Sequence, residues 1–90
     1  MPGVLKVLGT ERSCNTTANT YGGNVLVRLV NVSALGTSFL VTCKYANAAT
    51  RYTVSIGGMQ EIFLEKNTDD TLESNDTGTA VKAVAVAYRN

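Results

Sequence analysis

The sequence predicts an all-β fold, a small antiparallel β-sandwich or barrel of six to seven strands with a loop-rich N-terminal segment. Three observations predict it. Short runs rich in Val, Ile, Thr, Tyr and Phe recur at the spacing of hairpins, with turn residues between them. One run alternates strictly between apolar and polar residues, as half-buried antiparallel strands do. No segment shows the sustained 3.6-residue periodicity of a capped helix.

The N-terminal third contains a short apolar run, a long loop and one strong strand. Residues 4–8 are the apolar run, and residues 12–23 are rich in Asn, Thr and Gly, which predicts a loop. Residues 24–32 are apolar on both faces, with Arg28 and Asn31 as interruptions. A strand of this kind is covered on both sides, either at the centre of a sandwich or at a subunit contact.

Two further strands follow a glycine-containing turn at residues 33–38. Residues 39–45 place apolar side chains on one face and Thr and Lys on the other. Residues 47–50 have the composition of a hairpin loop, and residues 52–56 alternate strictly. The Gly57-Gly58 pair suits a two-residue primed turn, so we expect a tight hairpin at that point.

The chain ends with a strand at residues 61–65, an acidic turn at residues 67–73 and a closing strand at residues 80–90. The closing strand carries Val and Tyr on one face and Ala on the other. The alanines of this flat row are Ala83, Ala85 and Ala87. The row indicates one of two arrangements. The strand is a closely packed central strand whose neighbour supplies the larger side chains, or it is a surface that accepts side chains from another subunit.

Composition argues against several classes of function. The 90 residues form one domain, residues 1–90, with room for one modest core. The net charge of +1 gives no electrostatic footprint for nucleic acid or an anionic membrane, and no apolar run is long enough for a membrane span. The chain has no His, so it lacks the usual general base and the commonest neutral metal ligand. We therefore expect no enzyme activity, no cofactor, no bound metal, and neither nucleic acid nor membrane as a partner.

The two cysteines are Cys14 and Cys43. Residues 1–4 lack the charged and apolar regions of a secretory signal, so we expect two free thiols that pack as small hydrophobic groups. A disulfide between them stays open as an alternative, because the sequence does not give the distance between their segments. Neither lies in a CxxC motif, which argues against a metal site.

Charge is sorted by position along the chain. Six of the seven acidic residues lie between Glu61 and Asp76, and seven of the eight basic residues lie outside that window. This pattern predicts a small module that docks on a partner, with charge giving orientation more than affinity. The alternative is that the acidic segment is a turn exposed to solvent and binds no partner. The candidate partner-binding residues are Asp69, Asp70, Glu73, Ala83, Ala85 and Ala87.

Part of the chain resembles a known family. The strand end Leu64-Glu65-Lys66, the turn at residues 68–72 and the Val–Ala alternation of residues 81–88 are similar to the C-terminal half of small virion structural proteins, of the capsid decoration type, from tailed phages that infect marine cyanobacteria. The resemblance extends over residues 56–73 and 80–90, about a third of the chain. Asp70 departs from the family's shorter turn. The resemblance implies a structural role in the virus particle.

We therefore expect a capsid decoration, or cement, protein at the virion capsid surface. It would bind the major capsid protein and neighbouring copies of itself, as a homo-oligomer on the particle. Residues 1–23 would order as an N-terminal arm or as an added strand on a neighbour. Two alternatives stay open. One is a tail or neck component, with the alanine face as a ring interface. The other is a host- or carbohydrate-binding module, which the absence of Trp disfavours.

Overall fold

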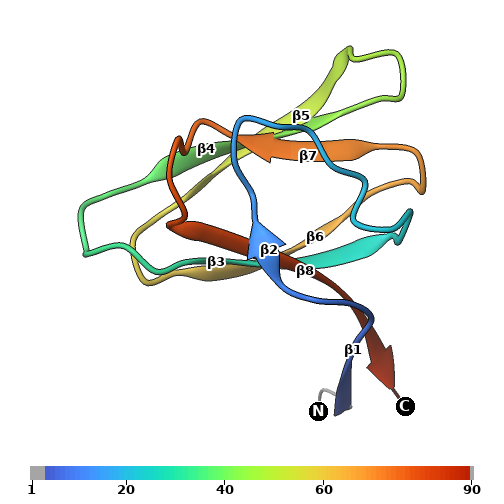
Figure 1. Cartoon of the computed structure of the whole chain (residues 1–90), viewed down its shortest axis with the longest axis horizontal. Coiled ribbons are helices and arrows are strands. Elements are labelled where there is room, and N and C mark those ends of the chain that lie inside the picture. Colours follow the sequence, from blue (N-terminus) through green and yellow to red (C-terminus); the bar gives the residue numbers. More distant parts are fainter. Residues whose placement is uncertain (1–3, 90) are drawn as a thin grey trace.

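Eight antiparallel strands in two packed sheets make up the structure, a computed structural model that describes residues 4–89 (Figure 1). The strands are β1 (Val4–Val7), β2 (Arg12–Ser13), β3 (Leu26–Asn31), β4 (Phe39–Lys44), β5 (Thr50–Ile56), β6 (Glu61–Glu65), β7 (Thr71–Ser74) and β8 (Val81–Arg89). The predicted all-β sandwich is confirmed. The described chain contains no helix that could cross a membrane.

The five-stranded sheet is built around β8, the longest strand. β3 pairs with one side of β8 and with β6 beyond it, which gives the order β1-β8-β3-β6. β1 and β2 pair in succession with the other side of β8, at its C-terminal and N-terminal halves. Figure 1 shows β1 and the end of β8 projecting together from the sandwich, where Val4 pairs with Arg89. β2 lies within a segment predicted as loop, and its two residues are too few for a periodic signal.

The three-stranded sheet has the order β5-β4-β7. β4 and β5 form a hairpin, whereas β7 pairs with the other side of β4. The turn predicted over residues 67–73 closes earlier, and β7 begins at Thr71. Charged and small polar residues in β7 hid its alternation, in which Leu72 and Ser74 face inward and Thr71 and Glu73 face outward.

The tight hairpin expected at the Gly57-Gly58 pair is wrong. β5 and β6 belong to different sheets, so the chain crosses from one layer to the other at this point. The glycine is needed for a close approach, because a Cβ atom on Gly58 would lie 2.0 Å from the carbonyl oxygen of Ala34. Gly58 therefore allows the loop after β3 to pack against the crossover between the sheets.

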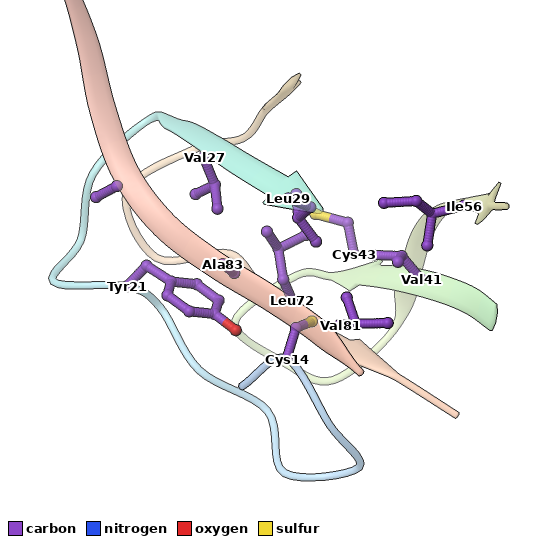
Figure 2. Close-up of a cluster of buried hydrophobic side chains, with 11 residues drawn as sticks. Cys14, Tyr21, Val27, Leu29, Val41, Cys43, Ile56, Leu72, Val81 and Ala83 are labelled. Carbon is purple, nitrogen blue, oxygen red and sulfur yellow. The ribbon is translucent and has the colours of Figure 1, made fainter. Parts of the chain in front are cut away.

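The core lies between the two sheets (Figure 2). From the five-stranded sheet it receives Val27, Leu29, Val81, Ala83 and Ala85, and from the three-stranded sheet Val41, Cys43, Ile56 and Leu72. Cys14 and Tyr21, from the segment between β2 and β3, complete the cluster. The small alanines of β8 leave room for these larger neighbours. The interpretation of the alanine row as a closely packed central strand is therefore correct for its two buried members.

The segment before β3 packs on its own domain, and the expectation of an N-terminal arm over residues 1–23 is wrong for residues 4–23. Asn19 and Leu72 exchange two backbone hydrogen bonds of 3.1 and 2.9 Å. The amide of Ser74 donates to the carbonyl of Asn15 at 2.8 Å. These contacts attach the loop to the outer edge of β7. Residues 1–3 lie outside the described part of the chain.

Candidate docking surface

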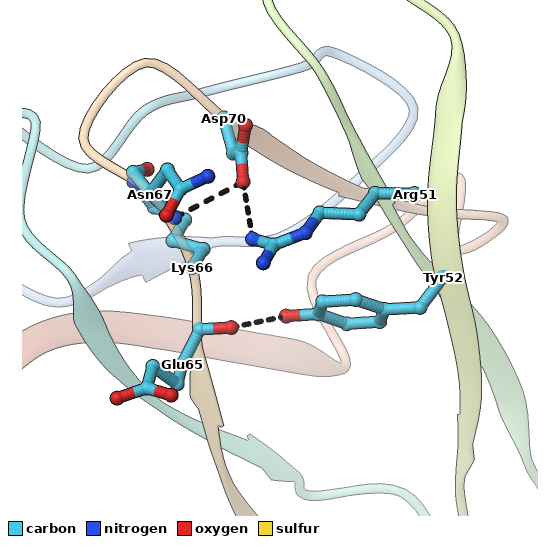
Figure 3. A network of polar contacts seen from close by, with 6 residues as sticks. All are labelled: Arg51, Tyr52, Glu65, Lys66, Asn67 and Asp70. Atoms are coloured by element: carbon cyan, nitrogen blue, oxygen red, sulfur yellow. Dashed lines mark hydrogen bonds and ion pairs between the residues drawn. The ribbon is translucent and has the colours of Figure 1, made fainter.

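Asp70, predicted to bind a partner, holds the turn between β6 and β7 instead (Figure 3). Its side chain is buried and accepts a hydrogen bond of 3.0 Å from the backbone amide of Asn67. It also forms an ion pair of 2.6 Å with Arg51 of β5. The Asn67 amide and the Arg51 guanidinium both favour the charged carboxylate, so the pKa of Asp70 lies below its usual value. The assignment of Asp70 to a partner surface is therefore wrong, because a partner cannot reach the carboxylate.

The other acidic residues of the segment are also mostly engaged within the chain. Glu73 forms an ion pair of 3.1 Å with Lys44 on the outer face of the three-stranded sheet. Asp76 is buried and accepts three backbone hydrogen bonds. Asp69 is exposed at the tip of the turn. The sorting of charge along the sequence thus reflects internal pairing more than an open acidic surface.

Tyr52 links the two sheets on the side of the sandwich where Lys66 is buried. The Lys66 ammonium is buried, donates 3.2 Å to the carbonyl of Asn67, and has its pKa lowered by burial. The Tyr52 hydroxyl of β5 donates 2.9 Å to the carbonyl of Glu65 of β6 (Figure 3). The hydrogen bond from Tyr52 to Glu65 and the ion pair between Arg51 and Asp70 therefore link the end of β6 and the turn after it to β5.

The alanine row does not form a subunit surface. Ala83 and Ala85 face the core, and Ala83 is fully buried. Only Ala87, on the projecting part of β8 that pairs with β1, is half-buried. Because the folded chain covers Ala83 and Ala85 itself, their assignment to partner binding is wrong.

The outer face of the five-stranded sheet carries several apolar side chains beside charged ones, since Glu65 lies opposite Leu26 and Val30 lies between Glu61 and Lys82. In β3 the side chains that alternate with the core are Leu26, Arg28 and Val30, all half-buried. Phe63 of β6 and Val84 of β8 flank Arg28 in register on this face. We call the accessible apolar part of this surface the docking face, and it consists of Val7, Leu26, Val30, Val32 and Phe63.

Several of these side chains are well exposed. Val7 and Val32 each keep 59% of their surface accessible, and Phe63 keeps 37%. On the same face of β8, Val84 lies opposite Arg28 and Val86 lies opposite Val7, and both are almost fully buried. The chain itself covers part of this apolar layer, and exposed valines lie at both of its ends. Apolar side chains of this kind are typical of the centre of a protein–protein interface.

Charged groups organise the middle of the docking face. Arg28 forms an ion pair with Glu61 of β6 and a second, at 3.5 Å, with Glu11 of the segment between β1 and β2. The stem of Arg28 lies in the cross-strand row between Phe63 and Val84. Long charged side chains of this kind cover apolar surface with their methylene groups and keep the charge at the surface.

The outer face of the three-stranded sheet has the opposite character. Its outward side chains are mostly polar: Thr42, Lys44, Thr53, Ser55, Thr71 and Glu73. Leu40, 42% exposed, is an isolated apolar residue there. Within residues 4–89, the outer face of the five-stranded sheet therefore carries more apolar side chains than the outer face of the three-stranded sheet does.

The described residues offer little for chemistry on a small molecule. A cavity of about 130 Å³, lined in part by Leu8, Arg12 and Tyr21, is well below the several hundred Å³ of ordinary ligand pockets. No cluster of three or more His, Cys, Asp or Glu suited to a metal occurs between Val4 and Arg89. Cys14 and Cys43 are free and fully buried, which confirms the expected thiols, and burial raises the pKa of both. The Tyr21 hydroxyl points toward the sulfur of Cys14 (Figure 2).

Sequence reasoning missed the residues of the docking face, although one signal pointed to them. Residues 24–32 are apolar on both faces, and a subunit contact was one of the two explanations for that pattern. Comparison of the chain with protein-family models, curated proteins and solved structures found no match.

Proposed function

We propose that this protein is a capsid decoration protein of a tailed phage, which binds the major capsid protein through the docking face. The observation that carries the proposal is the contrast between the two outer faces of the sandwich. A small domain that leaves Val7, Val32 and Phe63 accessible on one face, and exposes Thr and Ser on the other, is suited to lie with its apolar face on a larger surface.

The energetics of decoration fit such a surface. Apolar burial contributes roughly 25 cal/mol per Å², so a patch of a few side chains gives only a modest affinity per copy. On a capsid, contacts to several neighbouring subunits act together and raise the overall avidity without one deep pocket. The ion pairs of Arg28 with Glu11 and Glu61 lie within this surface and would favour one orientation on the partner.

The resemblance of residues 56–73 and 80–90 to virion structural proteins supports a place in the particle. The symmetry of the particle gives head proteins and tail proteins different copy numbers. A head protein is present in many copies over an icosahedral surface, whereas a neck or tail ring has the low copy number of its rotational symmetry. The copy number per particle therefore distinguishes decoration from the alternative of a tail or neck component.

The test is binding of purified protein to undecorated phage heads, measured by co-sedimentation and imaged by cryo-electron microscopy. Val7→Glu and Val32→Glu each place a charge at one end of the docking face, at positions exposed enough to leave the fold intact. Leu40→Glu is the matched control, because it makes the same kind of change at an exposed apolar residue on the opposite face. We expect each docking-face variant to bind at least about tenfold more weakly, since an unpaired charge would be buried at the contact.

The expected result is regular density over the capsid faces, lost with the two docking-face variants and retained with Leu40→Glu. Density confined to the tail or neck, or equal binding by all three variants, would contradict the proposal. Circular dichroism of each variant shows whether the sandwich has formed.

A further inference from the structure

The edges of the two sheets differ in how they are protected against pairing with another chain. The outer edge of β7 is covered by residues 15–19 of the same chain. β6 carries Glu61 and Glu65 along its edge, and β1 is short and carries Lys6. Charged residues, short strands and covering loops are the usual ways in which edge strands avoid pairing.

β5 is neither short nor covered by a loop, and its one irregularity is a bulge at Arg51, where Cys43 pairs with Tyr52 and Lys44 with Thr50. It is an edge strand of seven residues, without proline, and no other strand in the described chain pairs with its outer side. Its one charged residue, Arg51, is directed at the buried carboxylate of Asp70 and forms an ion pair with it (Figure 3). The guanidinium of Arg51 therefore points toward Asp70 and does not hinder pairing of another strand with the β5 edge.

The hydrogen bonds of β4 show which backbone groups of β5 point outward. Leu40 of β4 bonds toward β7, because its amide donates to the side chain of Asn75 and its carbonyl accepts from the Asn75 amide. Alternation along an antiparallel strand then turns the backbone groups of Val41 toward β5, where Val54 is its partner. The amide and carbonyl groups of Thr53 and Ser55, which alternate with Val54, consequently point to the open edge.

The residues of β5 are complementary to a second copy of the same strand. If two β5 strands pair antiparallel about a two-fold axis at Thr53, each Thr53 lies opposite the other and exchanges both backbone hydrogen bonds with it. Tyr52 then lies opposite Val54 of the second copy, and the bulged residue Arg51 lies near Ser55. An aromatic residue opposite a β-branched one is a favourable cross-strand pair, and no like charges meet.

The half-buried side chains of β5 also favour pairing with a second copy of β5. Tyr52 and Val54 pack at the border of the core and remain partly exposed there. A second β5 would place an equivalent pair beside them and continue the apolar layer across the junction. The contact is isologous, so it closes as a dimer and does not propagate into a fibre.

We propose that two copies of this chain form a two-fold symmetric dimer through edge-to-edge pairing of β5, centred on Thr53. The joined sheet has the strand order β7-β4-β5-β5-β4-β7. Its contact involves one strand from each copy, which places it among small, concentration-dependent interfaces. The dimer uses the edge of the three-stranded sheet and leaves the docking face free, so it stands or falls independently of the proposed function.

A charge-swap experiment tests the pairing and its register together. Sedimentation equilibrium measures the dimer dissociation constant of the wild type, of Thr53→Lys, of Thr53→Glu and of an equimolar mixture of the two variants. We expect each single variant to dimerise roughly tenfold more weakly, because like charges lie directly opposite on the axis. The mixture should recover dimerisation, because Lys then lies opposite Glu. Thr42→Lys is the matched control, on the neighbouring strand and the same face but away from the edge.

The thermal unfolding midpoint of each variant, measured by circular dichroism, separates loss of pairing from loss of fold. A wild type that stays monomeric at millimolar concentration would overturn the proposal. So would a dimer that Thr53→Lys leaves unchanged, or a mixture that associates no better than its components. Slower amide exchange of Thr53 and Ser55 at high protein concentration is the expected direct signature of the new hydrogen bonds.

Discussion

Replacing Asp76 with Ala tests how the acidic segment stabilises the fold. Asp76 lies between β7 and β8 and is 4% exposed. One carboxylate oxygen accepts the amide of Gly78 at 2.8 Å, and the other accepts those of Ala80 and Val81 at 2.9 and 3.0 Å. The change to Ala leaves three backbone donors at the start of β8 without their acceptor.

The expected loss follows from these three contacts. A hydrogen bond to a charged group contributes about 1.5–3 kcal/mol, and burial of the carboxylate offsets part of the sum. We therefore expect Asp76→Ala to lower the free energy of unfolding by about 3–5 kcal/mol. That is a large share of the 5–15 kcal/mol typical of a whole domain. Asp76→Asn keeps one carbonyl oxygen and should lose about 2–3 kcal/mol.

Urea unfolding at pH 7, followed by far-ultraviolet circular dichroism, measures both variants. Asp69→Asn is the matched control, because Asp69 is exposed at the neighbouring turn, and it should change stability by less than about 0.5 kcal/mol. An Asp76→Ala protein within about 1 kcal/mol of the wild type would show that the three hydrogen bonds do not stabilise the fold as reasoned.

The same carboxylate predicts a pH dependence. Burial alone would raise the pKa of Asp76, but the three backbone donors outweigh it and the pKa lies below the ordinary value of 3.8. The unfolded chain therefore binds the proton at a higher pH than the native chain does. The contribution of Asp76 is fully present above about pH 5 and is lost as the pH falls through the native pKa. Asp76→Ala should show a shallower loss of stability below pH 4 than the wild type.

Two further predictions concern close packing and thiol burial. Gly58→Ala should lower the free energy of unfolding by about 3 kcal/mol because its Cβ meets a backbone oxygen, whereas Gly9→Ala, with no atom within 4 Å of its Cβ, should be neutral in the same urea titration. Cys14 and Cys43 should react with a disulfide reagent at pH 8 only as fast as the chain opens, since burial keeps both thiols protonated and inaccessible. Equal stability of the two glycine variants, or rapid labelling of the native protein, would contradict these expectations.

The sequence by itself determined the all-β class and the positions of the long strands. Alternation with a period of two follows from strand geometry, so residues 39–45 and 52–56 revealed which side chains share a face before any partner strand was known. The short strands β2 and β7 could not be found in this way. They exist because β8 and β4 supply a pairing edge, which is a contact between distant parts of the chain.

Only the tertiary structure decided which of the candidate residues face a partner. Asp70 and Ala83 lie in segments whose composition suits docking. Arg51 pairs with Asp70, and the three-stranded sheet covers Ala83. Both covering groups come from distant parts of the chain. Conversely, the two apolar faces of residues 24–32 were visible in the sequence, and the structure decided that one faces the core and the other stays half-buried on the outer face of the sheet. A side chain's type sets which contacts suit it, whereas the long-range pairing of strands decides which contacts it makes.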